Sequence, residues 1–199
     1  MKKNTISRVC VFCGSSVGKR KIYEETAKEM ARALSARGIN LVFGGGSVGL
    51  MGVISDEMLR HDREVIGIIP HGLSVREVAH LNLTELRVVR SMHERKSLMA
   101  EMADAFIALP GGFGTFEELF EIITWGQLGI HNKPIGILNV EGFYDQFLAL
   151  TDHAVSEGFI RPYYRELIVV ASTVDELLDR IESYEPPAGI MQWVELKES

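Results

Sequence analysis

The sequence predicts an α/β fold: a single-domain, Rossmann-like, doubly wound parallel sheet of about seven strands with helices on both faces. Short apolar runs alternate with amphipathic segments about seven times along the 199 residues, an order typical of parallel sheets covered on both sides. Glycine-rich turns follow several of these runs. No linker-like segment interrupts the alternation, so one domain over residues 1–184 accounts for it, followed by a C-terminal tail at 185–199.

The predicted strands are short apolar runs bounded by glycine, proline or polar residues. They cover residues 8–12, 40–43, 64–69, 86–89, 105–109, 135–138 and 167–170. The predicted helices have apolar residues at spacings of three and four. They cover residues 22–37, 50–60, 92–103, about 115–128, 142–157 and 174–183.

Composition narrows the functional classes. Apolar residues make up 46% and charged residues 24% of the chain, and the formal net charge is −6. This balance is ordinary for a soluble protein, and the acidic charge argues against a nucleic-acid partner. No apolar run approaches the length of a membrane span, and the N-terminal segment lacks the features of a signal peptide, so we expect a cytoplasmic protein with no membrane partner. The six histidines are scattered, and we expect neither a metal nor a cofactor.

The two cysteines form a C-x-x-C pattern, Cys10 to Cys13, which invites a redox or metal interpretation. A redox pair belongs at a helix start, whereas this pair lies along a predicted strand, where residues three apart point to opposite faces. Zinc would need further ligands. We therefore predict buried structural thiols.

Three glycine-rich turns each follow a predicted strand. They are 14–16 (GSS), 44–49 (GGGSVG) and 111–115 (GGFGT). In a doubly wound sheet, ligands bind outside the carboxyl ends of the strands, near the switch in strand order. The three turns should therefore share one rim and form a nucleotide-sized site.

The turn at Gly111, Gly112, Gly114 and Thr115 precedes a predicted helix, whose N-terminus favours phosphate. The glycines would let a ligand approach the backbone, and Thr115 would add a hydroxyl or cap the helix. A tight turn without a ligand is the alternative. A P-loop is excluded because no Gly-Lys-Ser/Thr occurs, and the strand at 64–69 lacks the carboxylate of an NAD site.

A second cluster, residues 91–96 (SMHERK), begins another predicted helix. Arg95 and Lys96 are cations near a helix N-terminus, which favours an anionic partner, although a solvated helix start is equally compatible. His93 is a candidate general acid or a surface residue. Glu117 and Glu118 suit their own helix start, but carboxylates at this position would also stabilise the cationic sugar that forms when an N-glycosidic bond breaks.

The motifs together resemble those of one known family. The segment 110–118 (PGGFGTFEE) resembles the PGGxGTxxE signature of the LONELY GUY (LOG) family, and 92–96 (MHERK) is similar to its MHxRK segment. Further similar stretches lie at 10–16, 42–52, 65–70 and 123–145, so the resemblance spans about residues 8–181. The family comprises cytokinin riboside 5′-monophosphate phosphoribohydrolases, labelled "possible lysine decarboxylase" in older usage.

The resemblance implies roles for particular residues. Arg95 and Glu118 would be the catalytic pair, with Glu118 stabilising the ribosyl cation or orienting water. The residues implied to bind substrate are Ser15, Gly45, Glu77, Met92, Arg95, Lys96, Gly111, Gly112, Gly114, Thr115, Glu117 and Thr124. The substrate would be a nucleoside 5′-monophosphate and the assembly a homodimer. Phe120, Trp125 and Leu128 would supply either an interface or ordinary core.

One departure concerns Arg90 and Ser91, where many relatives carry an acidic residue before the methionine; this affects base preference rather than the reaction. The expected reaction is cleavage of N6-modified adenosine 5′-monophosphates, and of AMP, to base and ribose 5-phosphate. A general AMP nucleosidase and a nucleotide-binding module without catalysis are the alternatives. Lysine decarboxylation is not expected, because no lysine occupies a recognisable setting for a pyridoxal cofactor.

Overall fold

A computed structural model describes residues 4–73 and 79–190. Its centre is a sheet of seven parallel strands in the order β4-β3-β2-β1-β5-β6-β7. The strands are β1 (Arg8–Phe12), β2 (Asn40–Phe43), β3 (Val65–Pro70), β4 (Glu85–Val89), β5 (Ala105–Ala108), β6 (Ile135–Leu138) and β7 (Ile168–Ala171). The predicted doubly wound α/β fold is confirmed.

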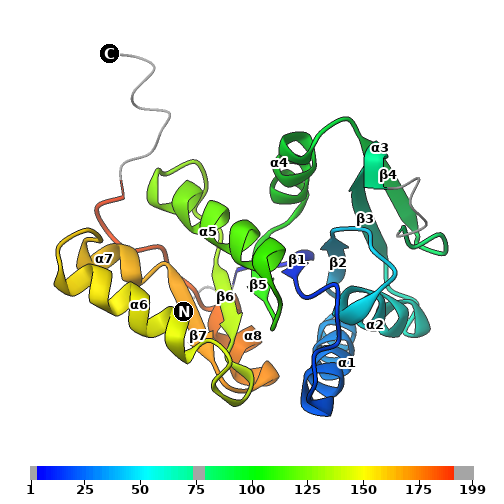
Figure 1. The fold of residues 1–199 in the computed structure, drawn as a ribbon, viewed down its shortest axis with the longest axis horizontal. Helices are drawn as coiled ribbons and strands as arrows, with labels where there is room; N and C mark the ends of the chain where they lie inside the picture. The colour runs from blue at the N-terminus through cyan, green and yellow to red at the C-terminus, as the bar shows by residue number, and fades with distance from the viewer. Residues whose placement is uncertain (1–3, 74–78, 191–199) are drawn as a thin grey trace.

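Helices cover both faces of the sheet. The helices are α1 (Lys21–Ala36), α2 (Gly49–Arg60), α3 (His71–Leu73), α4 (Met92–Met102), α5 (Phe113–Gln127), α6 (Asp145–Ser156), α7 (Pro162–Arg165) and α8 (Val174–Glu182). Side chains of α1, α2 and α8 pack with Val9 and Val11 of β1. Those of α4, α5 and α6 pack with Cys10 and Phe12 on the other face, and Figure 1 shows α4 and α5 across the sheet from α1 and α2.

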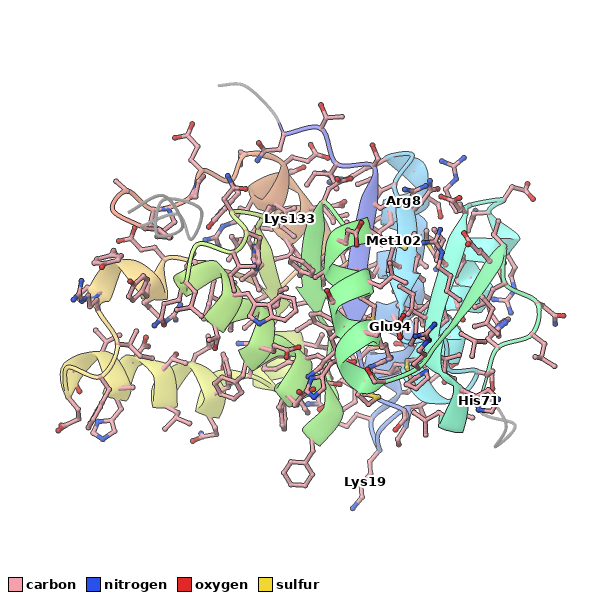
Figure 2. All side chains as sticks on the ribbon, turned by 90° about the horizontal axis from the view of Figure 1, so that it is seen from above. Arg8, Lys19, His71, Glu94, Met102 and Lys133 are labelled. Atoms are coloured by element: carbon pink, nitrogen blue, oxygen red, sulfur yellow. The ribbon has the colours of Figure 1, made fainter. Side chains whose placement is uncertain are left out.

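The strand order reverses between β1 and β5, so their carboxyl ends form the switch point. In Figure 2, Lys19 and His71, which follow β1 and β3, lie at the opposite end of the sheet from Arg8 and Lys133. Backbone hydrogen bonds join the glycine-rich turns there. Gly14 donates to the Pro110 carbonyl at 3.0 Å, and Leu50 donates to the Gly14 carbonyl at 2.9 Å. As predicted, the three turns share one rim.

One predicted helix starts later than expected. Instead of beginning at residue 142, α6 begins at Asp145, after a 3₁₀ turn (Val140–Gly142). Glu141 and Gly142 both adopt positive φ, 49° and 75°, which no α-helix accommodates. The Asn139 side chain holds the break, because its Oδ1 accepts from the Tyr144 N–H at 2.7 Å and its Nδ2 donates to Asp145 at 2.8 Å.

The cysteine prediction is confirmed. Cys10 and Cys13 are free thiols, both buried, and they contribute to the two different cores on either side of β1. Burial raises the pKa of the Cys10 thiol well above its ordinary value, so it stays protonated and unreactive. Within residues 4–73 and 79–190, no helix has the length and apolar character that crossing a membrane requires.

Candidate active site

Side-chain hydrogen bonds cap the start of helix α4. The hydroxyl of the N-cap residue Ser91 accepts a hydrogen bond from the Glu94 N–H at 3.1 Å, and the Glu94 carboxylate accepts one from the N–H of the preceding Arg90 at 2.8 Å. These two bonds stabilise the helix start. The segment that departs from the family pattern therefore has a structural role here, and the helix presents Arg95 and Lys96 to α5.

The Arg95 guanidinium is held on three sides. Its Nε donates to the Ile68 carbonyl at 3.0 Å, and its Nη1 donates to Glu118 Oε1 at 2.6 Å. On the third side is Gly44, where an added Cβ would lie 2.0 Å from Arg95 Nη2. Arg95 is only 8% exposed. The structure thus joins the two residues predicted to be catalytic, and it adds Gly44, which leaves room for the guanidinium.

Two opposing effects set the pKa of the Glu118 carboxyl. Burial raises the pKa of its carboxyl above the ordinary value, and the adjacent Arg95 guanidinium opposes that rise without cancelling it. A carboxylate in such a setting is poorly solvated and has one fixed cationic neighbour. It is therefore suited to stabilising positive charge that develops on a substrate nearby.

Lys96 forms a second cluster with α5. Its Nζ is ion-paired with Glu117 and lies 3.0 Å from Glu121 Oε1. Burial alone would lower the pKa of Lys96, but the hydrogen bonds that its ammonium donates to Glu117 and Glu121 outweigh this effect, and the pKa is raised. Glu121 was not predicted. Its spacing of four from Glu117, which places both on one helix face, was the available signal.

The glycines before α5 divide into two kinds. A Cβ at Gly111 would lie 2.1 Å from Thr115 Oγ1 and 2.9 Å from the Gly14 nitrogen, so Gly111 allows close packing of the two turns. At Gly112 and Gly114 an added Cβ would meet nothing within 4 Å, so the backbone there is open to a ligand. The helix begins at Phe113 with Gly112 as its N-cap. Thr115 is therefore buried inside the first turn and does not cap it.

A cleft of about 300 Å³ lies beside this turn. Ser15 lines it together with Gly111 and Gly112, and Tyr23 and Phe143 form another wall, with their ring centroids 5.8 Å apart. Its volume is at the lower limit for small-molecule sites. The predicted rim residue Ser15 thus adjoins the glycine turn.

The remaining predicted site residues lie less directly on the site. Gly45 has a positive φ of 74° and packs closely on β3, with its carbonyl accepting from the His80 N–H. Met92 is 43% exposed at the start of α4. Thr124 donates to the Phe120 carbonyl within its own helix at 2.7 Å. Glu77 lies outside the described residues.

Among the described residues, no cluster of three or more His, Cys, Asp or Glu side chains suits a metal ion. What the rim presents instead is an open helix N-terminus beside a buried carboxylate–guanidinium pair. Fold and geometry together define a Rossmann-like α/β protein whose rim carries an exposed helix N-terminus and a buried arginine–glutamate pair.

Comparisons with known proteins specify the family. The model of the family described as "possible lysine decarboxylase" matches residues 51–181. A cytokinin riboside 5′-monophosphate phosphoribohydrolase of Arabidopsis thaliana is 53% identical over 186 residues, covering 94% of this chain and 86% of that protein. A probable one of Oryza sativa subsp. japonica is 55% identical over 179 residues, covering 90% of this chain and 73% of that protein. The chain belongs to this family, the LOG family, as its motifs predicted.

Solved structures share the fold at greater distance. A molybdenum cofactor binding protein from Rippkaea orientalis is 18% identical with a TM-score of 0.67, covering 90% of this chain and 97% of that one. The molybdenum cofactor carrier protein of Chlamydomonas reinhardtii is 17% identical with the same TM-score, covering 90% and 98%. At this identity the likeness concerns the fold alone.

Proposed function

We propose that this protein hydrolyses the N-glycosidic bond of cytokinin riboside 5′-monophosphates, releasing the free base and ribose 5-phosphate. The 50–55% identical relatives are named for this activity. The observation that carries the proposal is the buried Arg95–Glu118 pair, which lies one to two helical turns beyond an open, glycine-flanked helix N-terminus. Such an arrangement suits a ligand that carries an anionic group for the helix N-terminus and develops positive charge near the buried carboxylate.

The proposed chemistry follows from these positions. The N–H groups at the start of α5, around Gly112 and Gly114, bind the 5′-phosphate. As the bond from C1′ to the base nitrogen lengthens, its electrons leave with the base and the ribose becomes oxocarbenium-like. The Glu118 carboxylate stabilises that charge and orients the water that adds to C1′, while the water's proton is released and the departing base is protonated. Arg95 keeps Glu118 ionised and in place.

The older decarboxylase label fits Lys96 and Lys133 poorly. A lysine that forms a Schiff base must lose its proton, but Lys96 has a raised pKa and two carboxylate neighbours. Lys133 has a pKa lowered by burial. It lies at the end of the sheet away from the rim, the same end as Arg8 in Figure 2. Neither lysine combines a low pKa with a place in the site.

The two other readings stay as alternatives. A nucleotide-binding module would use the same helix N-terminus, but it has no need of the buried Arg95–Glu118 pair. A general AMP nucleosidase would use the pair without preferring modified bases.

The assembly we propose is a cytoplasmic homodimer. Phe120 and Leu128 of the predicted interface segment are 45% and 41% exposed, and Ile130 beside them is 49% exposed, more than an ordinary core would leave.

The test is chromatography of products after incubation of the purified protein with N6-isopentenyladenosine monophosphate or AMP. Free base should appear, and Glu118→Gln, which keeps the side chain's shape, should reduce kcat by about a thousandfold. Glu157→Gln, an exposed glutamate after α6, is the matched control and should retain activity. Binding of both nucleotides without release of base would favour the binding module. Equal cleavage of the riboside would contradict the phosphate role of the α5 N-terminus.

A further inference from the structure

The hydrogen-bond ladder between β1 and β5 ends irregularly at the turn before α5. The Leu109 N–H donates to the Phe12 carbonyl at 2.9 Å. In a regular parallel ladder, the N–H of Gly14 would then donate to the Leu109 carbonyl. It donates instead to the Pro110 carbonyl at 3.0 Å. Because Leu109 is buried, its released carbonyl needs another donor.

Tyr144, in the segment that follows β6, supplies this donor. Its hydroxyl donates to the Leu109 carbonyl at 2.7 Å, and the whole side chain is buried. Burial raises the pKa of the Tyr144 hydroxyl above its ordinary value, so the group keeps the proton that it donates. The backbone of Tyr144 is itself fixed, because its N–H donates to Asn139 Oδ1 at 2.7 Å. The end of β5 is thus tied to the segment after β6.

The ring of the same tyrosine contacts the other end of the turn. It packs edge-to-face on Phe116, in the first turn of α5, with ring centroids 6.4 Å apart. Tyr144 therefore touches both the strand end before the glycine turn and the helix start after it. Between these two contacts lie Gly112 and Gly114, and glycine has the most permissive backbone of any residue. The direction of their N–H groups consequently depends on how the two ends are held.

We propose that Tyr144 is a positioning residue for the 5′-phosphate of the substrate. By holding Leu109 and Phe116, it fixes the direction of the backbone N–H groups between them. This inference rests on the proposed function, which places the phosphate at those groups. The phosphate is remote from the bond that breaks, so it is bound about equally in the ground state and the transition state. Removal of the Tyr144 hydroxyl should therefore weaken binding of phosphate-bearing ligands and change kcat little.

The experiment compares two Tyr→Phe substitutions that each remove one buried hydroxyl. Tyr144→Phe keeps the ring and removes the donor to Leu109. Tyr184→Phe is the matched control, because Tyr184 Oη is buried and has no hydrogen-bond partner among the described residues. Tyr184 also lines a cavity together with Lys133, which lies at the end of the sheet away from the rim. The control thus makes the same chemical change far from the phosphate turn.

Steady-state kinetics gives kcat and KM for N6-isopentenyl-AMP, and calorimetry gives the Kd of each product, ribose 5-phosphate and N6-isopentenyladenine. Tyr144→Phe should raise KM and the Kd of ribose 5-phosphate about fivefold, the scale of one hydrogen bond. The Kd of the free base and kcat should stay within about twofold of the wild type. Tyr184→Phe should change none of these quantities. Phe116→Leu, which alters the contact at the helix end, should weaken binding of ribose 5-phosphate in the same direction as Tyr144→Phe.

An unchanged Kd of ribose 5-phosphate in Tyr144→Phe would overturn the inference. Equal weakening of both products would also overturn it, because the hydroxyl would then support the site as a whole rather than the phosphate turn. The binding measurements do not depend on turnover. A wild-type protein that binds ribose 5-phosphate but cleaves no nucleotide would therefore refute the proposed function alone, and the two failures are distinguishable.

Discussion

Two ion-paired clusters join α4 to α5 through adjacent residues, and they differ in how their carboxylates meet water. In the inner cluster, the side chains of Arg95 and Glu118 are 10% and 11% exposed. In the outer cluster Lys96 is equally buried, but Glu117 is 54% exposed and Glu121 26%. The same two helices therefore carry one desolvated pair and one three-residue cluster whose acids are more exposed.

The difference in solvation separates a carboxylate suited to catalysis from residues that hold the two helices together. Burial raises the pKa of Glu118 despite its arginine partner, which makes a carboxylate that responds strongly to nearby charge. The outer acids instead raise the pKa of Lys96, which fixes a cation and links the helices. Solvated pairs contribute little free energy, whereas breaking a buried pair leaves an uncompensated charge. Substitutions in the two clusters should therefore have very different effects.

The largest effect should come from substitution of Arg95, the cation of the inner cluster. Arg95→Met fills similar space but leaves Glu118 buried without its partner, so the free energy of unfolding at neutral pH should fall by about 3 kcal/mol. Activity should fall by about a hundredfold or more, because Glu118 then tends to be protonated. Denaturant unfolding followed by circular dichroism measures the first effect.

The pH dependence of this loss of unfolding free energy serves as the control for Arg95→Met. The folded-state pKa of Glu118 is raised, so its protonated form dominates at low pH, where a neutral carboxyl needs no cation. The stability difference between Arg95→Met and the wild type should therefore shrink as pH falls through the Glu118 pKa. A difference that stays constant from neutral to acidic pH would mean that lost packing, rather than lost charge, explains the destabilisation.

An intermediate effect is expected at Gly44. In Gly44→Ala the new Cβ would lie 2.0 Å from Arg95 Nη2. The guanidinium is the end of a flexible side chain, so it should move while the backbone stays. Misplacement by about 1 Å should lower kcat roughly ten- to a hundredfold. Because Arg95 then opposes burial less, the pKa of Glu118 should rise further, and the acid limb of the kcat profile should shift to higher pH.

A matched substitution at a second glycine isolates the cause at Gly44. Gly72→Ala makes the same change at a position near the rim where an added Cβ meets nothing within 4 Å, and it should leave the profile unchanged. Steady-state kinetics between pH 4 and 8 would measure the position of the acid limb in both variants. A loss of activity in Gly44→Ala with an unmoved acid limb would contradict the role of Gly44 in placing Arg95.

The contrast between the clusters also shows what the sequence could predict. Continuous apolar runs such as 105–109 identified buried strands, and glycine turns after strands identified the shared rim, because both signals are local. The pairing of Arg95 with Glu118 was available only from resemblance to a family, since no spacing rule joins residues on different helices. The role of Gly44 was hidden for the same reason, because its partner Arg95 comes from a distant helix.

Two misses have different causes. The cap formed by Ser91 and Glu94 follows a Ser-x-x-Glu pattern, which is local and therefore visible in the sequence. The break before α6 had no comparable signal. The predicted helix began at residue 142, and nothing in the sequence pattern shows that Glu141 and Gly142 take left-handed conformations, beside which the Asn139 side chain bonds Tyr144 and Asp145.

The smallest effect should come from the outer cluster. Glu121→Gln removes one of two carboxylates from Lys96, and Glu117 remains to hold the ammonium. The carboxylate is partly solvated, so the free energy of unfolding should change by no more than about 0.5 kcal/mol. Activity should stay within about threefold of the wild type, because the desolvated Glu118 keeps its arginine. Denaturant unfolding and kcat/KM on the same preparation, beside Arg95→Met, measure both quantities. A tenfold loss of kcat in Glu121→Gln would show that the outer cluster acts on the reacting sugar, and solvation would then no longer separate the two clusters.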